Sequence, residues 1–167
     1  MKEIFERRSI RKYQDKPVDD ESIKKLLRAA MYAPSAGNEH PWHFILIKNR
    51  ERLNEITTIH PYTQMLKEAP LAIMVCADTS NVKYDGAYWV QDCSAAVQNI
   101  LLEGQHLGLG TCWCGVYPRE SLVKPVRDLF ELPDHIEPVA IIAVGYPAEE
   151  RQVKERYKED RVHNETW

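Results

Sequence analysis

The N-terminal segment gathers side chains that could hold an anion. Arg7, Ser9 and Arg11 lie on one side of the chain if the segment is extended, and Arg7 and Arg11 lie one turn apart if it is helical. Arg8 adds another guanidinium. A phosphomonoester carries a charge of about −1.5 to −2 near neutral pH, and guanidinium groups match its oxygens in pairs. The segment therefore suits a terminal phosphate, although a solvated basic turn is the simpler interpretation of these residues alone.

Residues 34–42 could contact a planar polar ligand. Gly37 and Asn38 tolerate a positive φ. Ser35 and Asn38 can hydrogen-bond a heterocycle, with Trp42 packed beneath it. A helix-to-strand connection with ordinary turn chemistry explains the same residues, and the sequence pattern does not favour one interpretation over the other.

Familiar nucleotide and hydrolase patterns fail in this sequence. Gly108 and Gly110 look like the start of a dinucleotide-binding loop, but position 113 is Trp and a strand is expected next, so the Rossmann fingerprint is broken. The sequence contains neither a Walker pattern nor a GxSxG elbow. A dedicated dinucleotide domain and a serine hydrolase are therefore not expected.

The cysteines and histidines do not suggest a metal site. We expect Cys112 and Cys114 to point to opposite faces of a strand, and His40 and His43 have no cysteine near them in the sequence. The four cysteines show no paired spacing, so we expect reduced thiols that serve packing.

Hydrophobic spacing predicts helices and strands in a mixed order. Helices are expected over 19–33, 51–57, 65–68, 84–107 and 120–130, and strands over 43–48, 71–76, 111–117 and 139–144. The pattern over 84–107 has apolar residues on nearly all its faces, so this helix must be buried on more than one side. In a chain of 167 residues that favours contact with a second subunit, and we expect a homodimer.

Composition narrows the class of protein. With 44% hydrophobic and 28% charged residues, the whole chain 1–167 is expected to form a single globular domain. A pI near 6.1 argues against nucleic acid as a partner. The mean hydropathy is −0.48, and the charged N-terminus does not resemble a signal peptide, so we expect a cytoplasmic protein without a membrane span.

Residues 148–167 form a strongly charged tail. Its large apolar residues are Val153, Tyr157, Val162 and Trp167. Their spacing modestly favours an arm that packs on the partner subunit over a solvated extension. Lys154 and Arg156 repeat the alternation of the N-terminal arginines, but taken alone they predict only a surface pair.

Five blocks in order along nearly the whole chain resemble the nitroreductase family of FMN-dependent enzymes. They are 7–13 (RRSIRKY), 34–42 (PSAGNEHPW), 91–99 with its QD and QN pairs, 108–113 (GLGTCW) and 144–147 (VGYP). The resemblance implies an α+β fold, namely a three-layer α-β-α sandwich. It also implies an obligate homodimer with FMN in two equivalent sites at the dimer interface.

The resemblance also assigns cofactor-binding residues by position. Arg7, Arg8, Ser9 and Arg11 match ligands of the phosphate and ribityl chain, and Lys154 and Arg156 match the basic pair that completes the phosphate pocket. Pro34, Ser35, Ala36 and Asn38 match the loop along the isoalloxazine, which the other subunit contributes. Cys114 and Gly115 match backbone that passes the ring. His40 stands where the family more often has Gln, and it remains a cofactor-binding candidate.

In this family the flavin carries the redox chemistry, and no catalytic side chain is required. The resemblance therefore implies an NAD(P)H oxidoreductase that works by a ping-pong mechanism, with a small nitroaromatic or quinone as acceptor. The alternatives are other reactions of the family, namely reductive dehalogenation, flavin breakdown and azoline oxidation, or a non-catalytic FMN-binding dimer.

Overall fold

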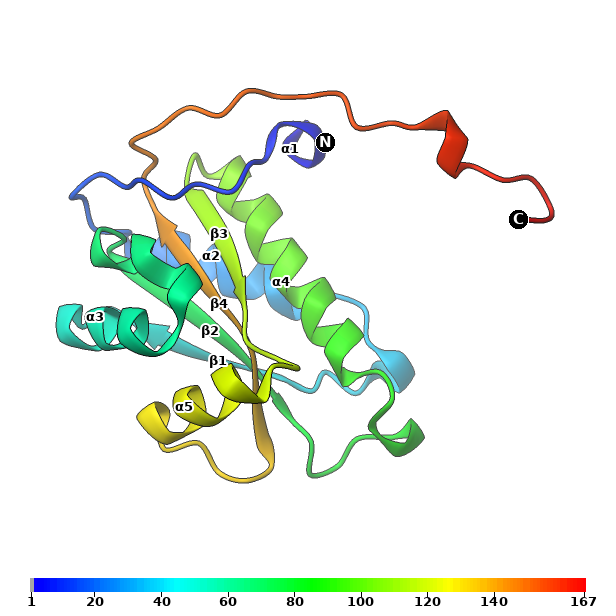
Figure 1. The fold of residues 1–167 in the computed structure, drawn as a ribbon, viewed down its shortest axis with the longest axis horizontal. Helices are drawn as coiled ribbons and strands as arrows, with labels where there is room; N and C mark the ends of the chain where they lie inside the picture. The colour runs from blue at the N-terminus through cyan, green and yellow to red at the C-terminus, as the bar shows by residue number, and fades with distance from the viewer. Residues whose placement is uncertain (1) are drawn as a thin grey trace.

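The computed structural model describes residues 2–167, and a four-stranded sheet lies at its centre (Figure 1). The strands are β1 (Trp42–Ile47), β2 (Leu71–Asp78), β3 (Gly110–Gly115) and β4 (Ile136–Gly145), in the order β1-β2-β4-β3. Every neighbouring pair is antiparallel. The fold is therefore a mixed α+β fold built on an antiparallel sheet. All four strands were expected, because each is a run of apolar and β-branched residues that ends at turn-forming residues.

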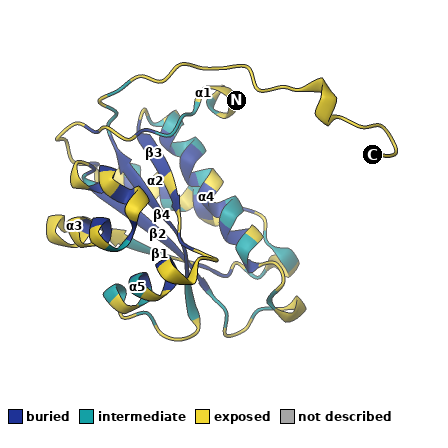
Figure 2. Cartoon of the chain, viewed as in Figure 1, coloured by how far each residue is buried: buried dark blue, intermediate teal, exposed yellow. Residues whose placement is uncertain are grey.

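Helices contact both faces of this sheet. Successive residues of a strand face opposite sides, and β2 is buried on both (Figure 2). Ile73 and Val75 join a hydrophobic cluster with α2 (Asp20–Met31) and α4 (Trp89–His106). Ala72 and Met74 join a second cluster with α3 (Arg50–Ile59), the 3-10 segment η2 (Pro61–Lys67) and α5 (Glu120–Phe130). The two clusters together hold the sheet between helices.

The long central helix begins later than expected. Tyr84 and Asp85 both have φ of 53° and lie in the separate short segment η3 (Tyr84–Gly86), so the helix α4 starts at Trp89. A positive φ is incompatible with a right-handed helix, and the expectation of a helix from 84 was wrong for this reason. One face of α4 is fully buried, whereas Ala95 and Leu102 on other faces are only half-buried.

The two ends of the chain meet beside β3. Ser9 forms a parallel bridge with Thr111, and Tyr13 forms an antiparallel bridge with Pro147 at the start of the tail. Beyond this point residues 151–167 are exposed and extend away from the body of the molecule (Figures 1 and 2). In the described residues 2–167, no helix has both the length and the apolar character needed to cross a membrane.

Candidate functional site

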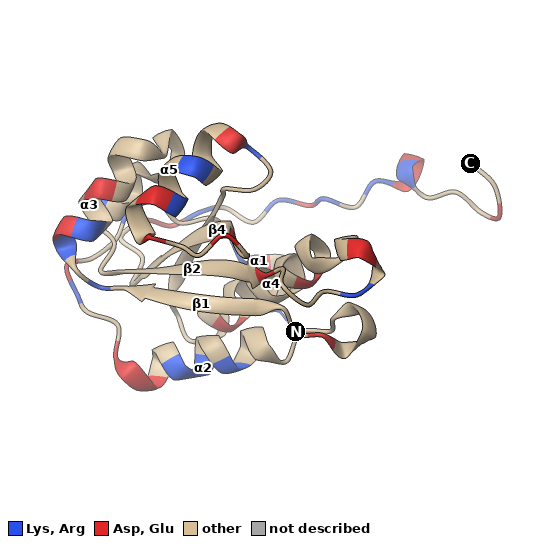
Figure 3. Ribbon diagram, turned by 90° about the horizontal axis from the view of Figure 1, so that it is seen from below, with Lys and Arg blue, Asp and Glu red and all other residues tan. Residues whose placement is uncertain are grey.

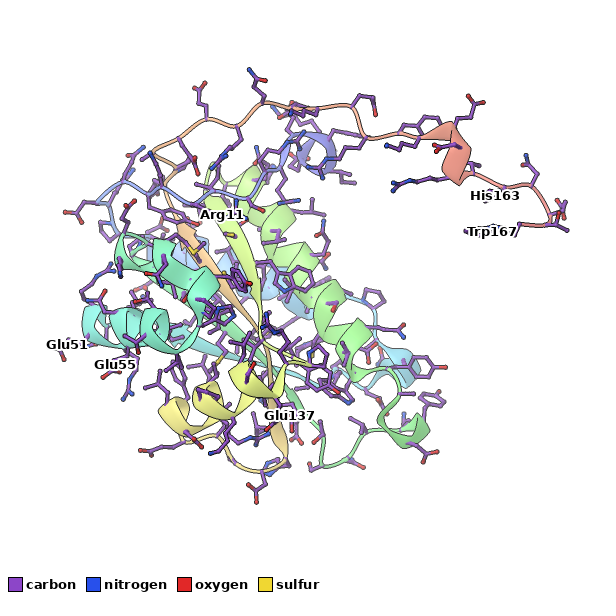
Figure 4. All side chains as sticks on the ribbon, viewed as in Figure 1. Arg11, Glu51, Glu55, Glu137, His163 and Trp167 are labelled. Atoms are coloured by element: carbon purple, nitrogen blue, oxygen red, sulfur yellow. The ribbon has the colours of Figure 1, made fainter. Side chains whose placement is uncertain are left out.

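The N-terminal arginines lie along the edge of β3. The backbone N–H of Ile10 donates to the carbonyl of Thr111 at 3.0 Å, so the segment runs beside the strand as an extended chain (Figure 4, where Arg11 is labelled). A Cβ on Gly110 would lie 2.7 Å from Cγ2 of Ile10, so only glycine allows this close approach. Of the two conformations considered from the sequence, extended and helical, residues 9–11 adopt the extended one.

The tail passes over the same arginines. The backbone N–H of Arg11 donates to Oε1 of Glu149 at 2.7 Å, and Nε of Arg8 donates to the carbonyl of Gln152 at 3.1 Å. Basic and acidic residues alternate along this tail (Figure 3). These contacts bring Lys154 and Arg156 to the N-terminal cluster. The residues Arg8, Ser9, Arg11, Lys154 and Arg156, together with Arg151, Gln152 and Glu155, line one cavity of about 560 Å³.

The cationic cavity lacks enough negative charge to balance it. Partial burial lowers the pKa of Arg7, and the nearby positive charges of Arg156 and Arg8 lower it further. Two nitrogens of Arg8 donate to backbone carbonyls, but its Nη2 is buried without a hydrogen-bond partner within residues 2–167. A buried donor without a partner costs about 1–3 kcal/mol. A phosphate in the cavity would offset the repulsion among these cations.

A second cavity of about 660 Å³ adjoins the first, and Arg11 lines both. Its wall includes His60, Tyr62, Trp113, Cys114 and Gly115. An ideal Cβ on Gly115 would meet no atom within 4 Å, so open space lies beside this backbone. The two cavities thus share Arg11 in their walls, with cations around one cavity and backbone and aromatic residues around the other.

The expectation that Cys112 and Cys114 face opposite sides of the strand was wrong. Residues two apart in a strand share a face, and both thiols pack in the cluster with α3 and α5. The pKa of Cys112 is lowered by the neighbouring Cys114 thiol, and further by Arg11, Ser9 and Arg7. The same coupling, together with burial, raises the pKa of Cys114. Within residues 2–167, no group of three or more possible metal ligands is present.

The loop at 34–40 lies away from the arginines, at the start of α4 (Figure 1). The backbone N–H of Ala36 donates to Oδ1 of Asp92 at 2.9 Å, and that of His40 donates to Oγ of Ser35 at 3.0 Å. The ring of His40 stacks on Trp42 with the centroids 5.3 Å apart. Pro34 is exposed, and Asn38 is exposed with a φ of 57°. None of these loop residues lines the two cavities beside Arg11, so a single chain does not join the loop to the arginine cluster.

The cavity-wall residues that sequence reasoning missed include His60, Tyr62 and Trp113. His60 precedes Pro61, and its ring nitrogen caps η2 by accepting from the N–H of Tyr62 at 3.3 Å. A His-Pro pair before a helical segment was the available signal for such a cap. Trp113 breaks the glycine fingerprint and belongs to the 108–113 block of the family resemblance, but the sequence assigns it no contact with a ligand.

Comparison with known proteins gives the family. The model of the Nitroreductase family matches residues 4–61 and 59–146. A Methanothermobacter thermautotrophicus protein, provisionally named an NADH dehydrogenase/NAD(P)H nitroreductase, is 53% identical over 164 residues, which are 98% of this chain and 85% of that protein. A crystal structure from Clostridium acetobutylicum, provisionally named an NADH oxidase, has a TM-score of 0.95 at 44% identity and covers 99% of both chains.

A third relative was solved with a ligand. It is a provisionally named nitroreductase from Desulfovibrio desulfuricans in complex with FMN, with a TM-score of 0.85 at 29% identity, covering 99% of this chain and 96% of that one. The matched residues include the arginine segment, the loop at 34–40 and all of β3. This chain therefore belongs to the nitroreductase family.

Proposed function

We propose that the protein is an FMN-dependent oxidoreductase that takes hydride from NAD(P)H and reduces small acceptors such as nitroaromatics or quinones. The observation that carries this proposal is the pair of cavities that share Arg11, which we take as one slot for the cofactor. Its cationic end suits a phosphomonoester, and its other end passes the open backbone at Gly115. Family membership and the FMN complex of the Desulfovibrio relative give independent support.

The residues divide into three groups by role. Arg7, Arg8, Ser9, Arg11, Lys154 and Arg156 would hold the phosphate and ribityl chain. Cys114 and Gly115 would pass the isoalloxazine ring, and the loop residues Pro34, Ser35, Ala36, Asn38 and His40 would cover the ring of the other subunit. When bound, FMN supplies two-electron chemistry in a ping-pong sequence with NAD(P)H and the acceptor. The chain itself binds, orients and shields this group.

We propose further that the chain is one domain that acts as a homodimer, in a three-layer α-β-α arrangement. Two hydrophobic clusters, one on each face of the sheet, support the layered description. A cavity of about 500 Å³ between α1 (Glu3–Glu6), α2 and α4 is lined in part by the exposed apolar side chains Ile4 and Tyr32, and their sequence neighbours Phe5 and Met31 are also exposed. Exposed apolar surface of this kind suits a subunit contact. The exposed tail residues Val153, Tyr157 and Val162 suit an arm on the partner.

Binding of FMN and of riboflavin to the purified protein tests the cofactor assignment. The two ligands differ only in the phosphate, so FMN should bind at least about tenfold more tightly, because charge-assisted hydrogen bonds contribute about 1.5–3 kcal/mol each. The variant Arg11→Ala should lose most of this preference, whereas Lys24→Ala, an exposed change on α2, should keep it. Equal affinity for both flavins in the wild type would refute the phosphate assignment.

A steady-state assay tests the activity. The FMN-loaded protein should oxidise NADH or NADPH in the presence of a nitroaromatic or quinone acceptor. Tight FMN binding without NAD(P)H oxidation would instead identify a non-catalytic flavin-binding dimer.

A further inference from the structure

His60 is a buried histidine with both ring nitrogens in use. Its side chain lies where α3 ends and η2 begins, and the residue is only 1% exposed. Nε2 lies 2.9 Å from the carbonyl oxygen of Gly115, and Nδ1 lies 3.3 Å from the backbone nitrogen of Tyr62. A carbonyl only accepts and a backbone N–H only donates, so Nε2 carries the proton and Nδ1 is bare. These two partners fix the neutral tautomer of His60.

The backbone around His60 is held as firmly as its ring. The N–H of His60 donates to the carbonyl of Ile56 at 3.0 Å, and Oγ1 of Thr63 donates to the carbonyl of His60 at 2.7 Å. Thr63 is itself fully buried. These hydrogen bonds fix the backbone of His60, and so they fix the position of its Nε2–H.

Gly115 lies at the end of β3, and the N–H that follows it, that of Val116, donates to the carbonyl of Val139 at 3.0 Å. Gly115 forms the last pair of β3 with β4, opposite Ala140, and it has no side chain. The side where a Cβ would stand is open space, so packing gives no support there. Besides the His60 bond, Sγ of Cys114 donates to the carbonyl of Tyr62 at 3.3 Å. These two contacts join the segment 60–62 to the end of β3.

We propose that His60 is a positioning residue for the flavin cavity, which holds the Gly115–Val116 peptide plane so that the Gly115 backbone passes the bound ring at a fixed distance. This inference rests on the proposed function. His60, Tyr62, Cys114 and Gly115 all line the same cavity, so the bond connects two of its walls. The Gly115 carbonyl belongs to the peptide plane that follows it, so the His60 bond holds the oxygen side of a plane whose N–H side is bonded to Val139.

Two substitutions of similar size separate this role from simple packing. In His60→Gln, the side-chain amide can replace the donor at Nε2, whereas in His60→Asn the shorter amide mimics only Nδ1. His60→Ala removes both groups. His135→Gln is the matched control, because His135 is an exposed histidine outside both cavities.

The first measurement needs no flavin. Hydrogen exchange of the backbone amides 113–117 is followed in the flavin-free protein, for variants whose circular dichroism matches that of the wild type. Exchange should be at least about tenfold faster in His60→Asn and His60→Ala, and within about threefold of wild type in His60→Gln and His135→Gln, because local opening follows the lost hydrogen bond.

The second measurement is the dissociation constant for FMN, together with the visible spectrum of the bound flavin. We expect affinity at least about tenfold weaker and a shifted spectrum in His60→Asn and His60→Ala, with both restored in His60→Gln. Wild-type exchange and affinity in His60→Asn would overturn the inference, as would faster exchange with unchanged affinity and spectrum. If the wild type bound no FMN, the proposed function would fail and the flavin role of His60 with it, while the exchange data would still show whether His60 holds Gly115.

Discussion

Oε1 of Glu149 lies 2.7 Å from the backbone nitrogen of Arg11 and accepts its hydrogen bond, which ties the root of the tail to the middle of the arginine segment. The other carboxylate oxygen pairs with Arg151 at 2.7 Å. One acidic residue thus connects two parts of the chain that both supply cations to the cavity. It does so from the backbone side of Arg11, which leaves the guanidinium of Arg11 free for a ligand.

Replacing Glu149 should release the tail without changing the cavity's positive side chains. In Glu149→Ala, trypsin should cleave after Arg151 and Lys154 several-fold faster, about threefold or more, because the tail loses a charge-assisted hydrogen bond. Glu150→Ala is the matched control, since Glu150 is exposed and adjacent. Equal cleavage rates in the two variants would contradict an anchoring role for Glu149.

Acid should weaken the same anchor. The backbone N–H of Arg11, followed by the contacts with Arg151, lowers the pKa of Glu149 below its ordinary value of 4.5. A carboxyl with a lowered folded-state pKa stabilises the fold above its unfolded pKa, and that contribution is lost as the pH falls through the lowered value. The melting temperatures of wild type and Glu149→Ala should therefore converge as the pH is lowered from about 6 to about 3. A difference that is constant with pH would contradict this.

Two glycines of β3 should differ in their response to the same substitution. In Gly110→Ala the new methyl group would lie 2.7 Å from Cγ2 and 2.8 Å from Cβ of Ile10, so overpacking should destabilise the fold by about 1–3 kcal/mol. In Gly115→Ala the methyl group enters open space, and the free energy of unfolding should change by less than about 0.5 kcal/mol. Urea denaturation of the flavin-free variants measures both changes.

Gly115→Ala also tests where the flavin ring lies. Because the Gly115→Ala methyl group occupies space that we assign to the flavin ring, FMN affinity should fall at least about tenfold although stability is unchanged. Unchanged affinity in Gly115→Ala would place the ring elsewhere.

The strands were predictable because their residues carry the signal locally. Apolar runs such as 71–76 and 139–144 lie inside β2 and β4, and no distant contact is needed to recognise them. The arginine segment was recognisable for the same reason. Its extended conformation was not, because it depends on Ile10 packing over Gly110, which lies a hundred residues away.

Long-range contacts also explain what was missed at the site. The hydrogen bond between Arg11 and Glu149 joins residues that are 138 positions apart in the sequence. The hydrogen bond between His60 and Gly115 joins residues that are 55 positions apart. No local pattern encodes such pairs. The shared orientation of Cys112 and Cys114, by contrast, was predictable from the sequence, because the two-residue period of a strand places both thiols on one face.

The pKa of Cys112 predicts a selective reaction. Because its pKa is lowered and it lines the second cavity, Cys112 should react with iodoacetamide at a lower pH than a thiol of ordinary pKa. Burial raises the pKa of Cys76 and Cys93 to about 12, so these two thiols should remain unmodified. Peptide mapping by mass spectrometry across a pH series identifies the labelled residue.

A substitution of Arg11 tests whether its charge lowers the pKa of Cys112. Its charge is one of the groups that lower the Cys112 pKa, so Arg11→Ala should move the half-maximal pH upward. Cys112→Ser should abolish the labelled peptide. A pH midpoint that is the same in wild type and Arg11→Ala would contradict the assigned electrostatic cause.

Asp92 should stabilise the loop at 34–40, because its side chain accepts a hydrogen bond from the loop backbone. It lies in the first turn of α4, is 6% exposed, and accepts the N–H of Ala36 through Oδ1, while its Oδ2 is buried without a partner within residues 2–167. In Asp92→Ala the Ala36 N–H loses its acceptor, so stability should fall by about 1–3 kcal/mol. Asp92→Asn keeps an acceptor for the Ala36 N–H, so its loss of stability should be smaller.

In the proposed dimer the loop at 34–40 contacts the flavin bound by the other subunit. Asp92→Ala therefore tests whether the loop and the arginines of one site come from different subunits or from the same one. If the loop covers the partner's ring, Asp92→Ala should weaken FMN binding although it touches no residue of the arginine cluster, and Gln91→Ala, an exposed neighbour on α4, should not. Mixing Asp92→Ala with Arg11→Ala subunits then decides the matter. In a mixed dimer one site carries both defects and the other carries neither, so one tight FMN site per dimer should reappear. If no tight site returned in dimers shown to be mixed, the loop and the arginines would act within one subunit.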